Sequence, residues 1–170
     1  DPAAYGEHYV ETPTGANVVQ NNQIGELNAG NRVGILLRGD ARMNLIGGTG
    51  RGEPNLVVEN VKTGLQIDGI VVSQPNTANR IIGDLFTSNF GLSNGPDPLS
   101  EPPDGVGLLV SGGASGHLIG GDDPAEGNSF ARNRVGLYVH DSSEISVRNN
   151  RLGHTATGTS VINRNLMAGA

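Results

Sequence analysis

The residues that could carry acid–base chemistry are few in this chain and are scattered along it. Asp122-Asp123 is the only adjacent pair of acids, and paired carboxyl groups are what a glycoside hydrolase needs for its acid and base steps. The pair follows Ile-Gly-Gly and precedes Pro124, a context typical of a tight turn. We therefore favour a solvated turn over a catalytic dyad at this place.

Two histidines are candidates for proton transfer. His117 stands in a Gly-His-Leu phrase at a position where related segments carry Asn44 and Asn79, which favours a hydrogen-bonding corner histidine. The dipeptide His140-Asp141 follows an expected strand and could pair with Asp68 or Asp40, which also lie beside expected strands. Ordinary turn aspartates are the competing interpretation of these acids.

Lyase chemistry on uronates needs an Arg or Lys base together with acids that hold Ca²⁺. Lys62 is the only lysine of the chain, and no arginine is flanked by acids in that way. Three Tyr and three Phe in 170 residues offer no platform for stacking sugars. We assign no catalytic, cofactor-binding or metal-binding residue, and we do not expect an enzyme.

Composition explains why candidate sites are scarce and turns are frequent. The chain has 27 glycines and 18 asparagines among its 170 residues, and these residues tolerate positive φ or hydrogen-bond to their own backbone in turns. Apolar residues never gather with helical spacing, so the fold is expected to be all-β. A net charge of −6 without basic clusters speaks against a nucleic-acid partner, and no apolar run is long enough to span a membrane.

An internal repeat organises these elements. Residues 31–37 (Asn-Arg-Val-Gly-Ile-Leu-Leu) recur as residues 133–139 (Asn-Arg-Val-Gly-Leu-Tyr-Val). We place anchoring glycines at positions 34, 69, 107 and 136, which gives steps of 35, 38 and 29 residues. Repeats of that length built from two helices are excluded, because the apolar runs here are three to five residues long and end at Gly or Asn.

Two more elements follow each anchor. One contains Ile46, Ile81 and Ile119, and a looser one contains residues 56–58, 129–130 and 161–162. The phrase Asn-x-Ile/Leu-Gly also occurs near both ends of the repeat, and we expect its asparagines to stack as one ladder across coils; they are Asn22, Asn44, Asn79 and Asn150. Three short strands per repeat predict a right-handed parallel β-helix of about 4–5 coils, with inward Ile, Leu and Val stacked about 4.8 Å apart.

The phrase at residues 105–121 (Gly-Val-Gly-Leu-Leu-Val-Ser-Gly-Gly-Ala-Ser-Gly-His-Leu-Ile-Gly-Gly), together with Asn-x-Ile-Gly, resembles right-handed parallel β-helix repeat proteins of the pectate-lyase-like superfamily. The resemblance runs from about residue 17 to residue 166. It implies the fold, with any catalysis on an outer face where side chains of successive coils align. The superfamily joins polysaccharide lyases, hydrolases and epimerases to phage tailspikes and non-catalytic surface proteins, so it implies no single activity.

The places where the repeat fails define the expected domain organisation. Residues 1–15 lack the pattern and are expected to form an N-terminal cap or lead-in to the β-helix of residues 16–170. Residues 93–104 carry four prolines and three acids, which predicts a loop that projects from the rod. Residues 161–166 are expected to begin a fifth coil that stops at Ala170 without an amphipathic helix to cap it.

These features together favour a non-catalytic structural β-solenoid, a surface, fibre or filament subunit that self-associates through its ends. We expect it outside the cell or on the cell surface, without a cofactor. The first alternative is a polysaccharide-binding or polysaccharide-cleaving module, or a fragment of a pectate lyase or polygalacturonase-like enzyme. A phage tail-fibre segment, which would form a trimer, is a further alternative.

Overall fold

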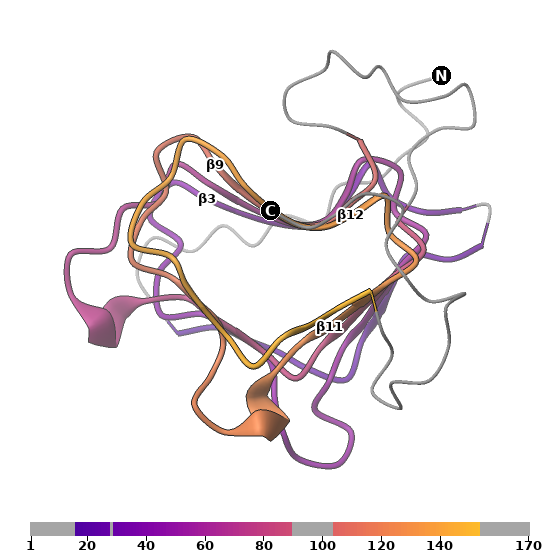
Figure 1. The fold of residues 1–170 in the computed structure, drawn as a ribbon, viewed down its shortest axis with the longest axis horizontal. Coiled ribbons are helices and arrows are strands. Elements are labelled where there is room, and N and C mark those ends of the chain that lie inside the picture. Colours follow the sequence, from indigo (N-terminus) through magenta and orange to yellow (C-terminus); the bar gives the residue numbers. More distant parts are fainter. Residues whose placement is uncertain (1–15, 28, 90–103, 154–170) are drawn as a thin grey trace.

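The computed structural model describes residues 16–27, 29–89 and 104–153, and these residues form a parallel β-helix of about five coils. In Figure 1 the traces of successive coils lie over one another, from indigo at the N-terminal side to yellow at the C-terminal side. Each of the first four coils contributes one strand to each of three sheets, the described part of the last coil contributes a strand to two of them, and every pair of neighbouring strands is parallel. The predicted fold class is confirmed.

The strands belong to the three sheets as follows. The first sheet contains β1 (Val18–Val19), β4 (Leu45–Gly47), β7 (Arg80–Ile82), β10 (Leu118–Gly120) and β13 (Ser146–Arg148). The second contains β2 (Gln23–Ile24), β5 (Leu56–Val58), β8 (Leu85–Thr87), β11 (Ser129–Ala131) and β14 (Arg151–Leu152). The third contains β3 (Val33–Arg38), β6 (Thr63–Asp68), β9 (Val106–Ser111) and β12 (Val135–Val139). Two short 3-10 helices, η2 (Pro75–Thr77) and η3 (Pro124–Glu126), lie in turns.

The core consists of inward side chains stacked in columns, because alternate residues of a strand face the same side. Phe86 and Phe130 stack in the middle of the second sheet, with ring centroids 5.0 Å apart. The column of the first sheet is Val19, Ile46, Ile81, Ile119 and Val147. The column of the second sheet is Ile24, Val57, Phe86, Phe130 and Leu152. The stacking of Ile46, Ile81 and Ile119 confirms the second repeated element.

The glycines of the third sheet correct one part of the predicted repeat. The register pairs Gly34 with Gly64, Gly64 with Gly107 and Gly107 with Gly136, so Gly69 is not the anchor of its coil. A Cβ on Gly64 would lie 2.6 Å from the carbonyl oxygen of Gly107, so this column has no room for a side chain. Gly64 was not recognised as the anchor because Thr63 and Gln66 of β6 interrupt the run of apolar residues that surrounds the other anchoring glycines.

Each corner of the coil holds a ladder of polar side chains that are buried in the middle coils, and we number the ladders by the sheet that each precedes. The first ladder contains Asn17, Asn44, Asn79 and His117. The second contains Asn22, Asn55, Asp84, Asn128 and Asn150. The third contains Asn31, Asn60, Asn89 and Asn133. The single ladder predicted from Asn22, Asn44, Asn79 and Asn150 is therefore wrong, since the Asn-x-Ile/Leu-Gly phrase occurs at two different corners.

Three expectations fall outside the described residues. They are the N-terminal cap at residues 1–15, the projecting loop at residues 93–104 apart from Asp104, and the coil predicted to begin at residue 161. These expectations stay predictions.

Candidate functional site

Four polar residues of successive coils lie in one row at the end of the third sheet: Arg38, Asp68, Ser111 and His140. The register pairs Arg38 with Asp68 and Asp68 with Ser111. His140 comes directly after Val139, which pairs with Val110, and so continues the row. The residues that precede them in the strands face the core, so the row lies on the outer face. We call it the outer polar row.

The contacts within the outer polar row differ from the acid–base pair that the sequence left open as an alternative to turn aspartates. The Ser111 hydroxyl donates to Asp68 Oδ1 at 3.3 Å, and the exposed ring of His140 stacks on Tyr138 with centroids 5.9 Å apart. Strands of a sheet lie about 4.8 Å apart, so two coils separate Asp68 from His140 by roughly 10 Å. The acid–base pair considered for Asp68 and His140 is therefore not formed, because the coil that carries Ser111 lies between them.

The other acids proposed for this pair have turn functions. Asp40 is exposed, and its Oδ1 lies 3.3 Å from Arg42 Nη2. Asp141 has φ +46° and continues a column of left-handed residues that is otherwise glycine, namely Gly39, Gly69 and Gly112. Asp tolerates this backbone conformation better than most residues. The interpretation of these acids as turn residues is confirmed by their geometry.

The pair Asp122-Asp123 also forms a turn. Asp123 caps η3, since its Oδ1 accepts from the Ala125 backbone N–H at 2.8 Å while Glu126 accepts from the Asp123 backbone N–H at 3.2 Å. Asp122 forms an exposed ion pair with Arg148 of the next coil. Both carboxyl groups are engaged on the surface, as a solvated turn predicts.

His117 replaces asparagine in the first ladder, as predicted. Its Nδ1 accepts from the Asn79 backbone N–H at 3.4 Å, and its Nε2 lies 3.0 Å from the Ile70 carbonyl, to which the neutral tautomer donates. Burial lowers the pKa of His117, and the bond to Ile70 opposes this effect. A neutral imidazole with both nitrogens bonded holds the corner together and is not available for proton transfer.

Asp84 was missed by the sequence analysis and is the only buried acidic side chain among the described residues. Its Oδ1 accepts from the backbone N–H and from Nδ2 of Asn55, at 2.7 and 3.1 Å, while its Oδ2 is buried without a hydrogen-bond partner. Burial raises the pKa of Asp84 from 3.8 to about 7, against the opposing effect of the bonds from Asn55. Aligning Asp84-Leu-Phe with Asn55-Leu-Val and Asn128-Ser-Phe would have revealed it.

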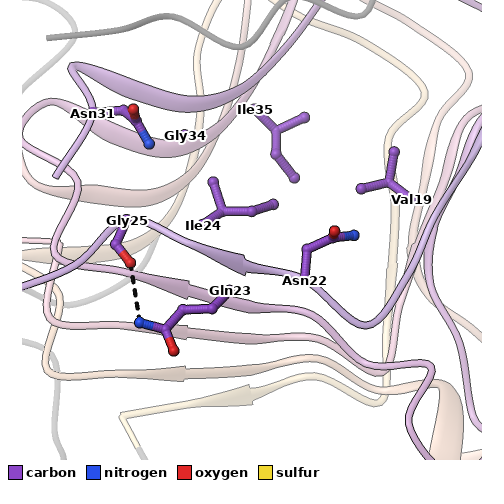
Figure 2. Close-up of a pocket in the computed structure, with 8 residues that line it drawn as sticks. All are labelled: Val19, Asn22, Gln23, Ile24, Gly25, Asn31, Gly34 and Ile35. Atoms are coloured by element: carbon purple, nitrogen blue, oxygen red, sulfur yellow. Dashed lines mark hydrogen bonds between the residues drawn. The ribbon is translucent and has the colours of Figure 1, made fainter.

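Two hollows accompany these polar features. One of about 250 Å³ lies at the N-terminal coil between Val19, Ile24 and Ile35, the apolar side chains that Figure 2 shows with Asn22 and Asn31. The other, of about 350 Å³, lies on the flank of the rod. It is lined by Val72, Ser73, Ala78, Gly116, His117, Leu118, Glu144, Ser146 and Arg148.

Some classes of site find no support in the part of the chain that the structure describes. No group of three or more His, Cys, Asp or Glu side chains there could hold a metal ion. No helix of these residues is sufficiently long and apolar to cross a membrane. The fold and its corner ladders define the protein as a parallel β-solenoid. Comparison of the chain with protein-family models, curated proteins and solved structures gives no match.

Proposed function

We propose that this chain is a structural β-solenoid, a rigid rod of a surface or extracellular assembly that joins other copies through its ends. The observation that carries the proposal is the course of the apolar columns. Val147 and Leu152 continue two columns that are fully buried in the three coils before them, yet they are 43% and 38% exposed. Apolar side chains aligned with a core and left partly in water are typical of an interface.

The interior of the rod supports a mechanical function. Backbone pairing, the Phe86–Phe130 stack and three ladders of buried amides connect each coil to the next. Buried polar groups that are fully bonded fix one arrangement of a core. A side chain that bonds to the coil before and the coil after cannot move without breaking bonds to both. Most of the buried polar groups therefore make the rod rigid.

The test measures the molar mass of the chain by sedimentation velocity over a hundredfold range of concentration. We expect mass to rise with concentration for the natural chain, and Leu152→Asp to reduce association at least tenfold by placing a charge in the interface. Val71→Asp is the matched control, because Val71 is 53% exposed on the flank of a middle coil. A natural chain that stays monomeric throughout would overturn the proposal.

A saccharide-binding or saccharide-cleaving module is the second candidate, and the outer polar row favours it. Arg38, Asp68, Ser111 and His140 bring a cation, a carboxylate, a hydroxyl and an imidazole to one face on four successive coils. The resemblance to the pectate-lyase-like superfamily implies such a face for catalysis. Uronate-containing polymers are the substrates to screen, by binding and by release of unsaturated or reducing ends. The double variant Asp68→Asn/His140→Ala would abolish either signal and leave association unchanged.

A further inference from the structure

The second ladder repeats one pattern of hydrogen bonds from coil to coil. At each described step the backbone N–H of one coil donates to the ladder side chain of the following coil, as Asn55 does to Asp84 at 2.7 Å. The Nδ2 group of an asparagine inside the ladder donates in both directions. Asn128 shows both bonds, one to Oδ1 of Asn150 in the following coil at 3.0 Å and one to the Ile81 carbonyl of the preceding coil at 2.7 Å. Such an asparagine ties its coil to both neighbours.

Asp84, in the middle of the rod, has the acceptors of this pattern without the Nδ2 donor. Its Oδ1 accepts twice from Asn55, whereas its Oδ2 is buried without a hydrogen-bond partner. By comparison with the neighbouring steps, Oδ2 stands in the place of an Nδ2 group whose acceptors are the Ile46 carbonyl and Asn128 Oδ1. Both of these acceptors are oxygens, so Oδ2 can bond to either of them only when it carries a proton.

The surroundings of this carboxyl group leave little room for water. Asp84 is 1% exposed, and a Cβ added to Gly47 of the preceding coil would lie 2.7 Å from its Cγ. A buried water needs space and at least two polar partners, and the backbone of Gly47 fills this side of the carboxyl group. An ionised Asp84 therefore gains hydration chiefly when the corner between the second and third coils opens.

The charged side chains nearby do not stabilise an ionised Asp84. On the segments that lead into this corner in the second, third and fourth coils they are Arg51, Glu53, Arg80, Asp122, Asp123 and Glu126. None of them forms a hydrogen bond or an ion pair with Asp84; Arg80 pairs with Glu126 instead. Burial raises the pKa of Asp84 from 3.8 to about 7, against the opposing effect of its hydrogen bonds. The folded rod therefore holds this proton at pH values at which an opened, hydrated carboxyl group releases it.

We infer that Asp84 is a pH-sensitive switch in the middle of the rod: its protonated carboxyl group joins the third coil to a neighbouring coil, and loss of the proton lets the corner at the second ladder open locally. The inference concerns a single chain and does not depend on the proposed function. Opening is least favourable below about pH 4, where the carboxyl group is protonated in both forms, and becomes easier as pH rises to about 7. Asparagine at this position keeps its donors at every pH and removes the switch.

Amide hydrogen exchange followed by NMR tests the switch, because it measures local opening residue by residue. The reporting amides are those of Leu85 and Ser129, which bond across this corner to the carbonyls of Asn55 and Asp84 at 3.0 and 2.8 Å. After correction for the intrinsic pH dependence of exchange, their protection should fall at least about tenfold between pH 5 and pH 8 in the natural chain. The protected amides of β6 and β9 in the third sheet should change much less. In Asp84→Asn the protection of Leu85 and Ser129 should stay nearly constant.

Infrared spectroscopy at pH 5 checks the proton itself. The carbonyl stretching band of a buried protonated carboxyl group should be present in the natural chain and absent in Asp84→Asn. The matched control Asp141→Asn, at an exposed turn, should keep both the band and the pH-dependent protection. Protection that does not fall in the natural chain, that falls equally in the third sheet, or that still falls in Asp84→Asn would overturn the switch. The comparison of two pH values in the natural chain stands even if a variant does not fold.

Discussion

Asp84 occupies a position in the second ladder that asparagine fills in the other four coils, so the variant Asp84→Asn measures what the carboxyl group does to stability. Asparagine can donate from Nδ2 to the strand carbonyl of the preceding coil, as Asn55 does to Val19 and Asn128 does to Ile81. For Asp84 the register makes that acceptor the Ile46 carbonyl. An ionised Oδ2 cannot donate, and it is buried without a partner.

The sign of the pH dependence follows from the pKa of Asp84, which burial raises from 3.8 to about 7 in the folded chain. The folded state holds a proton there that the unfolded state releases, so the free energy of unfolding is highest below about pH 4 and falls as pH rises to about 7. The shift corresponds to a loss of about 4 kcal/mol. No charged side chain is among the causes of the shift. Asn55 donates to the carboxyl group of Asp84, and Asn128 Oδ1 accepts from the backbone N–H of Asp84. Both of these side chains are neutral. Arg80 on β7 and Glu126 in η3 carry charges, and they pair with each other.

Urea unfolding at pH 4 and at pH 8 tests this reasoning on the natural chain and on Asp84→Asn. We expect the variant to be more stable by up to about 4 kcal/mol at pH 8, and to differ by about 1 kcal/mol or less at pH 4, where both side chains are neutral. Asp141→Asn makes the same charge change at an exposed turn and should differ little at either pH. Equal stability of Asp84→Asn and the natural chain at pH 8 would refute the buried ionised carboxyl group.

Three further substitutions test the interior by the same urea unfolding. Gly64→Ala should lower the free energy of unfolding by about 2–3 kcal/mol, because its Cβ would meet a backbone oxygen of the next coil at 2.6 Å. Gly39→Ala, whose Cβ would have nothing within 4 Å, should lower it by only about 1 kcal/mol because of the left-handed backbone. Equal losses would contradict the close contact at Gly64. Asn89→Leu should lower the free energy of unfolding by about 3 kcal/mol or more, because it leaves ladder groups of the coils on both sides unpaired. Asn22→Leu, at the first described position of its ladder, should lower it by less than about 1 kcal/mol. Phe86→Ala should lose about 3–5 kcal/mol through the cavity left in the aromatic stack, and a loss below about 1 kcal/mol would show that the stack is not part of the core.

The fold could be predicted from the sequence because its strongest signals are local. Gly34, Gly107 and Gly136 each open a short apolar strand, and the register places them in one column. Gly64 was missed because β6 alternates Leu65 and Ile67 with polar outward residues, so an apolar run after Gly69 was the more visible feature. Because the turns differ in length, the number of residues between coils does not reliably identify equivalent positions. The alternation of inward apolar residues such as Leu65 and Ile67 does give the correct register.

The candidate site was harder to predict because it depends on register across coils. His140 and Asp68 belong to the same row and both stand out in the sequence, but the sequence does not show that the coil carrying Ser111 lies between them. The turn at Asp123 and the corner function of His117 were accessible, since Pro124 and the alignment with Asn79 are local signals. The raised pKa of Asp84 is caused by its burial, and no local motif in the sequence indicates that this side chain is buried.

The effect of a side chain in this solenoid depends on its coil more than on its type. Val147 occupies the same column as Ile119, which is fully buried, and Leu152 occupies the same column as Phe130. Replacing the inner member of a column removes core contacts and lowers the free energy of unfolding. For the outermost member, the proposed end-to-end association predicts that an added charge lowers association before it lowers the free energy of unfolding. A substitution series along one column, measured for both stability and assembly, therefore locates the boundary between core and interface.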